Sequence, residues 1–453
     1  MRNWFDGSSR PSSPSRNRAR KMWYSALPNL TNYKQEVKEV FLRLFQRHIP
    51  ATFTIFERSN CQHKRPASYI LIMAAVGGLF CSVPGSAEVA RSMYNDARRL
   101  SLATYNTRRA EYGVGTTAED KFVIVKTFLL TGLYGLCSGD KRSYEFVEAC
   151  YADLTGAVLE YAETFQASDL ADDRIAQRRL LEALFILDSY RVIIMIRPPL
   201  SPWCALESVT ECSGLGTKLT KLLSRINMGK DLDEEAPGLA VLAAIAPQVW
   251  SAMYPRQNAY AGDNVLVEAI TVGQSNFAEI ACERWLSAHV SGEPEAPHLA
   301  VYHMMNILLH ANVILLQSFA HSPPGSLARD PQRSIMAREV LRWTEDRHHS
   351  IAHWHAEQLM SVIEMAVAHR MTDQHHNSAR FARNQPSPDT QESPHVPYAV
   401  YFAALVLWCG GVMHEPSLIP SELRAPIVRG ERVLLLHKIH VAQLLARALG
   451  GIT

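Results

Sequence analysis

The eight cysteines of this 453-residue chain form no metal-binding pattern. None lies two to four residues from another cysteine, which is the spacing that zinc knuckles and zinc fingers use. A chain of this length can bury a large core and needs no disulfides to stabilise it. We therefore expect reduced, mostly buried thiols, and no zinc ion or other cofactor bound by this chain.

The chain also has few long hydrophobic runs. Residues 69–83 are too short for a bilayer crossing, which needs roughly 20 apolar residues. Residues 396–413 are longer, but the run begins beside Pro397 and ends in Cys409-Gly-Gly. Mean hydropathy is −0.09, and no apolar segment follows the amino-terminal arginines as in a secretory signal. We expect buried core helices here and no contact with a membrane.

Patterns typical of enzymes are missing. The sequence contains no Gly-x-Ser-x-Gly motif, which places the nucleophile in many hydrolases. Residues 214–218 (GLGTK) have neither the full spacing of a phosphate-binding loop nor a strand before them. We therefore expect a protein that is not an enzyme.

What the sequence does have is helical periodicity. Hydrophobic residues make up 47% and charged residues 20%, the balance of a folded globular protein. No useful stretch alternates with the period of two that a β-strand shows. The pattern predicts an all-α fold, a large irregular array of about a dozen helices. Beyond a first helix ending near residue 48, we expect helices at about 67–81, 86–103, 119–136, 142–165, 174–196, 215–226, 238–254, 263–290, 297–320, 331–371 (a stretch that can break in two), 397–411 and 431–449.

Composition divides the chain into four parts. Residues 1–29 are rich in Ser, Pro and Arg and are expected to be a disordered basic arm. Residues 30–371 are expected to form the helical domain, and residues 372–396, which are polar and hold three prolines, a flexible surface loop. The helices in residues 397–453 would complete the same domain.

The basic arm is the only strongly charged segment, because the whole chain carries a net charge of only +2. Its cluster Arg16, Arg18, Arg20 and Lys21 is a candidate for nuclear import or for contacts with phosphate groups. Such a cluster would bind DNA weakly and without sequence specificity. A solvated tail with no function is the alternative interpretation.

Asp188 stands out because it follows the four apolar residues 184–187 (LFIL) inside a helical pattern. A buried carboxylate is tolerated when it is paired or hydrogen-bonded. The sequence offers Arg191 one turn later, and Arg178 and Arg179 earlier in the same helix. We interpret these four residues as a structural ion pair or ion-pair network, because no second carboxylate or nucleophile stands nearby to indicate catalysis.

A histidine-rich segment follows later in the chain. Within it His349, His353 and Glu357 fall on one helical stripe and could in principle hold a zinc ion. However, His349 is not followed by the glutamate that serves as general base in helical zinc proteases. Solvated histidines on a helix face are the main interpretation of this segment, which also holds His348 and His355, and a metal-dependent enzyme is the alternative.

Six segments together resemble a known family. They are residues 45–53 (FQRHIPATF), 71–80 (LIMAAVGGLF), 97–100 (ARRL), 128–142 (FLLTGLYGLCSGDKR), 178–190 continuing to 197–199 (RRLLEALFILDSY, RPP) and 397–408 (PYAVYFAALVLW). In this order they are similar to the fungal-specific transcription factor domain, the regulatory middle homology region, over roughly residues 30–450. The LCSGDKR version is most similar to members with zinc fingers of the C2H2 type.

The resemblance implies a nuclear regulator of RNA polymerase II transcription. In that family a separate zinc-finger module reads DNA, and the helical domain sets activity through protein partners or an effector. It also implies a homodimer or heterodimer with related transcription factors. Zinc would belong only to a finger module.

The chain departs from the family in two respects. The acidic and tryptophan residues that usually precede the paired arginines are missing, and Asp172 and Asp173 stand nearby instead. No zinc finger is present, because Cys61 and His63 alone cannot form one. We expect either a naturally finger-less regulator or the regulatory part of a longer protein, with DNA bound only through the missing finger or weakly through the basic arm. A ligand-sensing helical protein that binds a small metabolite between helices is the alternative.

Overall fold

The structure is a computed structural model that describes residues 33–57, 66–110, 118–163, 171–200, 222, 238–254, 264–289, 294–322, 331–377, 391–414 and 420–452. The described residues form helices and no strands, which confirms the predicted all-α fold. The basic arm lies outside the described residues, as does the predicted helix at 215–226 except for Leu222.

The first group of helices, which we call the N-terminal group, comes from the first 193 residues. Its members are α2 (Gln35–His48), the short η3 (Thr54–Phe56), α3 (Ala67–Gly78), α4 (Ser86–Ala110), α5 (Ala118–Cys137), α6 (Lys141–Glu163) and α7 (Ala171–Ile193).

The remaining helices divide into a linking set and a C-terminal group. The linking set is α10 (Leu239–Ala243), α11 (Ala246–Met253) and α12 (Asn264–Ser287). The C-terminal group is α13 (Ala296–His310), α14 (Val313–Ala320), α15 (Pro331–Thr344), α16 (Arg347–Asn377), α17 (Val396–His414), α18 (Pro420–Leu423), α19 (Ala425–Leu435) and α20 (His440–Gly450).

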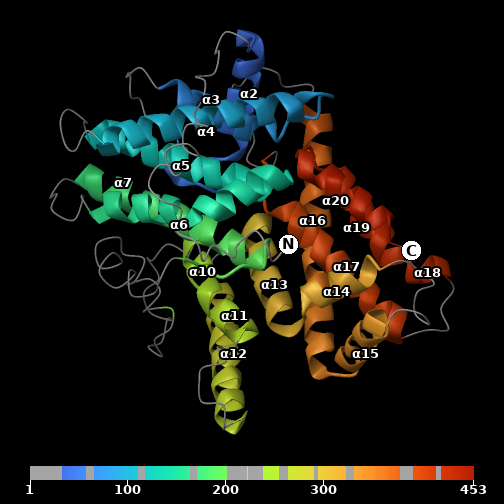
Figure 1. Ribbon diagram of the computed structural model, residues 1–453. Helices are drawn as coiled ribbons and strands as arrows, with labels where there is room; N and C mark the ends of the chain where they lie inside the picture. Colours follow the sequence, from blue (N-terminus) through green and yellow to red (C-terminus); the bar gives the residue numbers. More distant parts are fainter. Residues whose placement is uncertain are drawn as a thin grey trace.

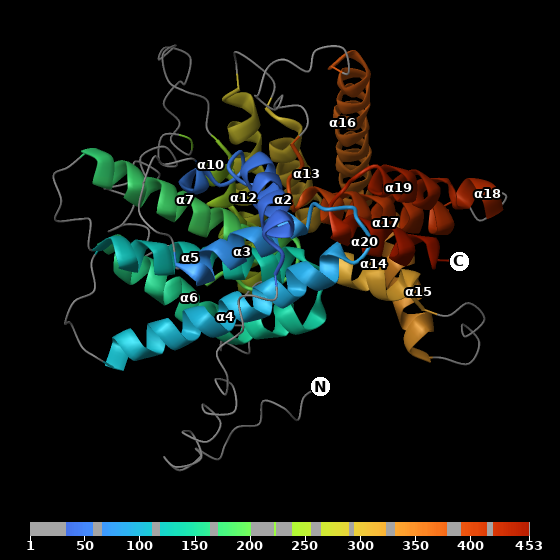
Figure 2. The same ribbon diagram turned by 90° about the horizontal axis from the view of Figure 1, so that it is seen from above.

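The two groups lie side by side, and the linking set occupies the space beneath them in Figure 1. The view from above agrees, with α2–α7 on one side and α13–α20 on the other (Figure 2). Helices α10 and α11 pack on α7, while α11 and α12 pack on α13, so the linking set contacts both groups. Every group buries an apolar face against its neighbours, which is what an amphipathic or wholly apolar helix requires.

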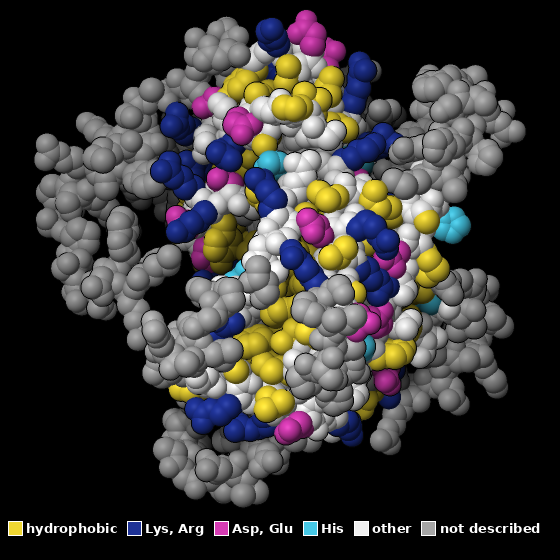
Figure 3. Space-filling model, turned by 90° about the vertical axis from the view of Figure 1, so that its right-hand side faces the viewer, with side chains coloured by type: hydrophobic (Ala, Val, Ile, Leu, Met, Phe, Trp, Pro, Cys, Tyr) yellow, Lys and Arg dark blue, Asp and Glu magenta, His cyan; other side chains and the backbone are white. Residues whose placement is uncertain are grey.

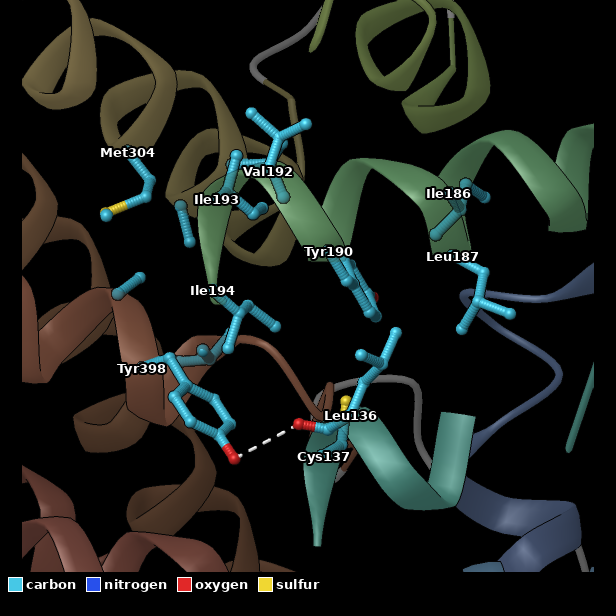
Figure 4. Packing of buried hydrophobic residues seen from close by; sticks show 14 of the residues in the cluster. Leu136, Cys137, Ile186, Leu187, Tyr190, Val192, Ile193, Ile194, Met304 and Tyr398 are labelled. Carbon is cyan, nitrogen blue, oxygen red and sulfur yellow. Dashed lines mark hydrogen bonds between the residues drawn. The ribbon is translucent and has the colours of Figure 1, made fainter. Parts of the chain in front are cut away.

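The end of α5, the end of α7 and the start of α17 meet where the two groups touch (Figure 4). There the Tyr398 hydroxyl of α17 donates a hydrogen bond to the Leu136 carbonyl of α5 at 3.3 Å. Tyr190 of α7 is fully buried in the same region and stacks edge-on against Phe53 at 6.1 Å between ring centroids. Segments far apart in the sequence therefore share one core.

The most apolar helix is α17, and it lies in the interior of the C-terminal group. By length and composition it is the one single helix of the described residues that could cross a membrane, but 78% of the apolar window Val396–Met413 is buried inside the structure. It packs against α13, α14, α15, α16, α19 and α20. These neighbours account for an apolar sequence with little periodicity, since such a helix needs partners on several sides.

Two predicted helices are interrupted in the structure. The stretch 297–320 was expected to be one helix, but α13 and α14 meet at a bend of 85°. The Asn312 side chain accepts the N–H of Leu315 at 3.1 Å and so caps the start of α14. The stretch 331–371 breaks between α15 and α16, as the prediction allowed, and Asp346 accepts the N–H of His348 at 3.2 Å.

The predicted flexible loop at 372–396 is wrong at both ends. Residues 372–377 continue α16, and residues 391–396, which we call the buried strap, lie inside the protein. The backbone N–H of Glu392 donates to Nδ1 of His48 at 3.0 Å. The hydroxyls of Ser393 and Thr52 lie 3.1 Å apart. Polar composition suggested a surface loop, but Glu392, Ser393 and His395 of the strap each find a partner on a distant part of the chain. Residues 378–390 lie outside the described residues.

The C-terminal half of the strap bonds to both groups of helices. The imidazole of His395 lies 2.7 Å from the Tyr190 hydroxyl through Nδ1 and 2.8 Å from the Pro297 carbonyl through Nε2. Because a carbonyl only accepts, Nε2 carries the proton and the tyrosine donates to Nδ1. Burial lowers the pKa of His395 to about 4, so this ring is neutral at pH 7.

The surface of the C-terminal group mixes both signs of charge. Figure 3 shows basic and acidic side chains next to one another, with hydrophobic side chains between them. One such arrangement is an ion-pair network between α16 and α19. Arg429 contacts Glu357 at 2.6 Å and Glu364 at 2.9 Å, and Arg432 contacts Glu364 at 3.3 Å. This mixture fits the small net charge of +2.

Helices α2 and α3 approach closely at Gly77. A Cβ atom added there would collide with the Phe41 carbonyl oxygen and would lie 2.8 Å from the backbone nitrogen of Phe45. Both contacts are with backbone, which cannot turn aside as a flexible side chain can. Gly156 offers the opposite case, because it is exposed in the middle of α6 and a Cβ there would meet nothing within 4 Å.

These two glycines provide a matched pair of substitutions. Gly77→Ala should destabilise the protein by about 3 kcal/mol or more, because it forces two packed helices apart. Gly156→Ala should stabilise it by about 0.5–1 kcal/mol, since alanine is the better helix former. Urea unfolding followed by circular dichroism measures both. Equal stability of the two variants would show that α2 and α3 do not pack as described.

Candidate functional sites

Asp188 lies near the end of α7 and holds the chain that follows this helix. It is 3% exposed, and its two carboxylate oxygens each lie 3.1 Å from the backbone nitrogen of Leu200, which donates to them. Nearby, Nε of Arg191 donates to the Pro198 carbonyl at 3.3 Å. In the segment between Arg191 and Pro198, the backbone of Ile196 has a φ of 50°. This left-handed region costs a non-glycine residue roughly 1–2 kcal/mol. The contacts from α7 stabilise this strained turn.

The arginines proposed as partners of Asp188 are distributed differently from the prediction. Arg178 and Arg179 lie ten and nine residues earlier on the same helix, more than about 13 Å away along its axis, so the structure separates them from Asp188. Each arginine has a glutamate instead. The pairs are Arg178 with Glu182 at 3.5 Å, Arg179 with Glu57 at 2.9 Å and Arg191 with Glu148 at 3.1 Å.

Arg191 and Asp188 share a neighbour, the buried ring of Tyr151. The Arg191 guanidinium lies over this ring at 4.3 Å from its centroid. Burial, and then the charge of Asp188, raise the pKa of the Tyr151 phenol well above its usual value. The phenol is therefore neutral at pH 7. A direct ion pair between Asp188 and Arg191 stays a prediction.

Asp188→Ala should lower the free energy of unfolding by about 1–3 kcal/mol, because it leaves the Leu200 amide without its acceptor. Thermal and urea unfolding of purified protein measure the loss. Arg178→Ala is the matched control, since its ion pair is partly exposed and spans a single helical turn, and it should cost less than about 0.5 kcal/mol. Wild-type stability in Asp188→Ala would contradict the structural role.

The histidine-rich segment forms pairs between helices. Nδ1 of His303 lies 3.0 Å from Nδ1 of His355, and Nδ1 of His310 lies 2.8 Å from Nδ1 of His348. The first residue of each pair is on α13 and the second on α16. From the first pair to the second, the residue number rises by seven on α13 and falls by seven on α16. The two helices are therefore antiparallel, and the two pairs are about two turns apart.

Each pair requires one protonated and one unprotonated Nδ1, because a hydrogen bond joins a donor to an acceptor. Burial lowers the pKa of His303 to about 4, and burial together with the nearby His303 and His310 lowers that of His355 to about 3. Burial, then His348 and Arg347, lower the pKa of His310 to about 4. The rings of His303, His310 and His355 are therefore neutral at pH 7.

The prediction of solvated histidines is right for His348, which is exposed, and wrong for His355, which is 6% exposed. Sequence reasoning missed His303 and His310, although the same seven-residue spacing on both helices was a usable signal. Glu279 of α12 was also missed, and its carboxylate lies 3.5 Å from Nε2 of His310.

The proposed metal-binding stripe does not come together as one site. The rings of His349 and His353 are 5.7 Å apart between centroids, and His349 also meets the ring of Trp343 edge-on at 4.8 Å. The third member, Glu357, is engaged by Arg429 at 2.6 Å. Among the described residues, no group of three or more His, Cys, Asp or Glu side chains is arranged to hold a metal ion.

Acid should destabilise the protein through these histidines. A histidine whose pKa is lowered on folding stabilises the folded state above pH 6.5, and this contribution is lost as the pH falls below that value. For His355 the loss between pH 7 and pH 5 is about 2 kcal/mol. His355→Gln should therefore lose about that much less than wild type over this range. Urea midpoints at both pH values measure it, and identical losses in the two proteins would contradict the buried, neutral pair.

A hollow of about 390 Å³ lies next to the pair formed by His310 and His348, which we call the outer histidine pair. It is formed where α11, α13 and α15 end and where α14 and α16 begin. Its lining mixes apolar and polar residues. The lining residues are Ala252, Met253, Tyr254, Leu308, Leu309, His310, Ala311, Asn312, Glu339, Arg342, Trp343, Asp346 and His348.

A hydrogen bond joins two of the helices that line the hollow. The indole N–H of Trp343 donates to the His310 carbonyl at 2.8 Å, which fixes α15 against the end of α13. Leu308, His310 and Ala311 are each 5% exposed or less and form the buried side. The volume lies in the range of small-molecule sites.

Comparisons of the chain with models of protein families, with curated proteins and with solved structures find no match. The resemblance to the fungal regulatory domain therefore depends on the six segments quoted above.

Proposed function

We propose that the chain is the regulatory domain of a fungal transcription factor, acting in the nucleus on transcription by RNA polymerase II. It would work through protein partners or an effector and would not be an enzyme. Any zinc-finger module would be separate from this sequence. The basic cluster Arg16, Arg18, Arg20 and Lys21 would serve nuclear import or weak contacts with DNA phosphates. Its partners would be related transcription factors, in a homodimer or heterodimer.

The observation that carries the proposal is the meeting of the resembling segments in one core. The segment 128–142 supplies Leu136, and the segment 397–408 supplies Tyr398, which are joined by a hydrogen bond of 3.3 Å. The segment 45–53 supplies Phe53, whose ring meets that of Tyr190 from the segment 178–190. These four segments therefore pack into one hydrophobic core, as expected if they belong to a single domain.

A second candidate function is ligand sensing without a direct role on DNA. The hollow beside His310 and His348 favours it, because it lies at the ends of several helices of the C-terminal group. A ligand bound there would contact α11, α13 and α15 together. The two functions are compatible, since an effector site within a regulatory domain would combine them.

A tethering assay tests the first function. The chain fused to an unrelated sequence-specific DNA-binding domain should raise or lower expression of a reporter several-fold in a fungal host, compared with the DNA-binding domain alone. The physical reason is that a regulatory domain keeps its partner contacts when another module brings it to DNA.

The two glycine variants serve as matched controls in this assay. Gly77→Ala should abolish the effect because it disturbs helix packing, and Gly156→Ala should retain it. A nuclear, well-expressed wild-type fusion that leaves the reporter unchanged would contradict the proposed function.

A further inference from the structure

The hollow beside the outer histidine pair has an excess of carboxylates in its lining. Two carboxylates, Glu339 and Asp346, line it, against the single guanidinium of Arg342. Among the described residues, no lysine or arginine comes within 4.0 Å of the Glu339 carboxylate. The His310 ring adds no positive charge at pH 7, because burial lowers its pKa to about 4. Carboxylates therefore outnumber guanidinium groups in the lining by two to one.

Backbone dipoles act in the same direction. Helices α11, α13 and α15 end at Met253, His310 and Thr344, next to the hollow. The carboxyl end of a helix carries a partial negative charge, which stabilises a nearby cation by about 0.3–1 kcal/mol. The two helices that begin there are capped by side chains, Asn312 on α14 and Asp346 on α16. Those caps occupy N–H groups that would otherwise attract an anion.

A third carboxylate stands behind the buried wall. Glu279 approaches His310 on the side of the ring away from His348, at 3.5 Å from Nε2. Its charge opposes that of Arg347, which also acts on the His310 ring, and neither side chain lines the hollow itself. Coulomb interactions at such partly buried positions are stronger than in bulk water.

The remaining lining suits an apolar body with an aromatic contact. Met253, Leu308 and Ala311 contribute aliphatic and thioether surface. Trp343 and Tyr254 contribute aromatic rings, and the indole is fixed by its hydrogen bond to the His310 carbonyl. Aromatic rings attract cations through their negative faces, by about 0.5–2 kcal/mol depending on exposure. Burial raises the pKa of the Tyr254 phenol, so it is neutral at pH 7 and can donate a hydrogen bond.

We propose that this hollow binds a small organic cation, an ammonium group carried on an apolar body. The ammonium lies towards Glu339 and Asp346, and the apolar body packs against Met253, Leu308 and Trp343. The volume of about 390 Å³ accommodates a compact molecule of this kind. The biological role as an effector site rests on the proposed regulatory function, whereas the binding itself does not.

Calorimetric titration of the purified chain at pH 7 tests the proposal. The probes are 2-phenylethylammonium and isopentylammonium, each compared with the alcohol of the same shape and with 3-phenylpropionate. At least one ammonium should bind with 1:1 stoichiometry and at least about tenfold more tightly than its alcohol, a difference of about 1.4 kcal/mol. The carboxylate should bind more weakly than the ammonium.

Substitutions locate the binding. Glu339→Gln should weaken ammonium binding by about tenfold, because it removes one of the two lining carboxylates. Its matched control is Glu345→Gln, an exposed glutamate six residues later that does not line the hollow, and it should leave the affinity unchanged. Trp343→Leu should weaken binding of both ammonium probes by removing the aromatic contact.

The contrary results are clear. Absence of binding by both ammonium probes, equal binding of the alcohols or the carboxylate, or equal effects of Glu339→Gln and Glu345→Gln would each overturn the proposal. The tethering assay separates this outcome from the fate of the proposed function. A reporter response without ammonium binding overturns only the site, and binding with a silent reporter overturns only the regulatory function.

Discussion

The buried strap at residues 391–396 is the constraint on which the arrangement of the two helical groups depends. Its Glu392 carboxylate accepts the backbone N–H groups of Lys438 and Ile439 at 3.0–3.2 Å and lies 3.5 Å from Arg370. Burial raises the pKa of Glu392, while the hydrogen bonds from Lys438 and Ile439 and the charge of Arg370 oppose that rise. From the same short segment, Glu392 reaches the end of α2 and His395 reaches α7. Without the strap the N-terminal and C-terminal groups would share mainly apolar contacts, which set no unique orientation.

The two histidine pairs fix the register of the antiparallel helices α13 and α16 in a similar way. Apolar side chains alone would tolerate a shift of one helix along the other, but two histidine pairs two turns apart have to match together. A slip by one turn would leave four imidazoles without their partners, three of them buried, and a buried polar group without a partner costs about 1–3 kcal/mol. The pairs therefore determine where α13 ends, and with it the position of the hollow between α11, α13 and α15.

The all-α class and most helices could be predicted because each follows from the local spacing of apolar residues. The break at Asn312 could not, since a capping asparagine inside an apolar stretch looks the same as a tolerated polar residue. The strap was misjudged for a related reason. Its Glu, Ser and His residues are typical of a surface loop unless partners exist, and the partners of Glu392 lie 46, 47 and 344 residues away. Likewise His303 and His355 become a pair only once the register of two helices is known. The seven-residue spacing on each helix was a signal for the pairs, but the register that joins His303 to His355 is set by tertiary contacts. The hollow likewise depends on helix ends whose positions tertiary contacts decide.

The long separation between the strap and its first partner has a consequence for biosynthesis. A chain grows from the ribosome at about 5–20 residues per second, so His48 emerges roughly 20–70 s before Glu392, 344 residues later, can reach it. Within that interval the apolar helices α3 and α5 leave the ribosome, while the strap that orients them against the C-terminal group has not yet been synthesised. The nascent N-terminal helices must wait with part of their apolar surface uncovered, a situation in which chaperones commonly bind. Truncated products that stop before the strap would remain in that incomplete state, which makes them natural substrates for protein quality control.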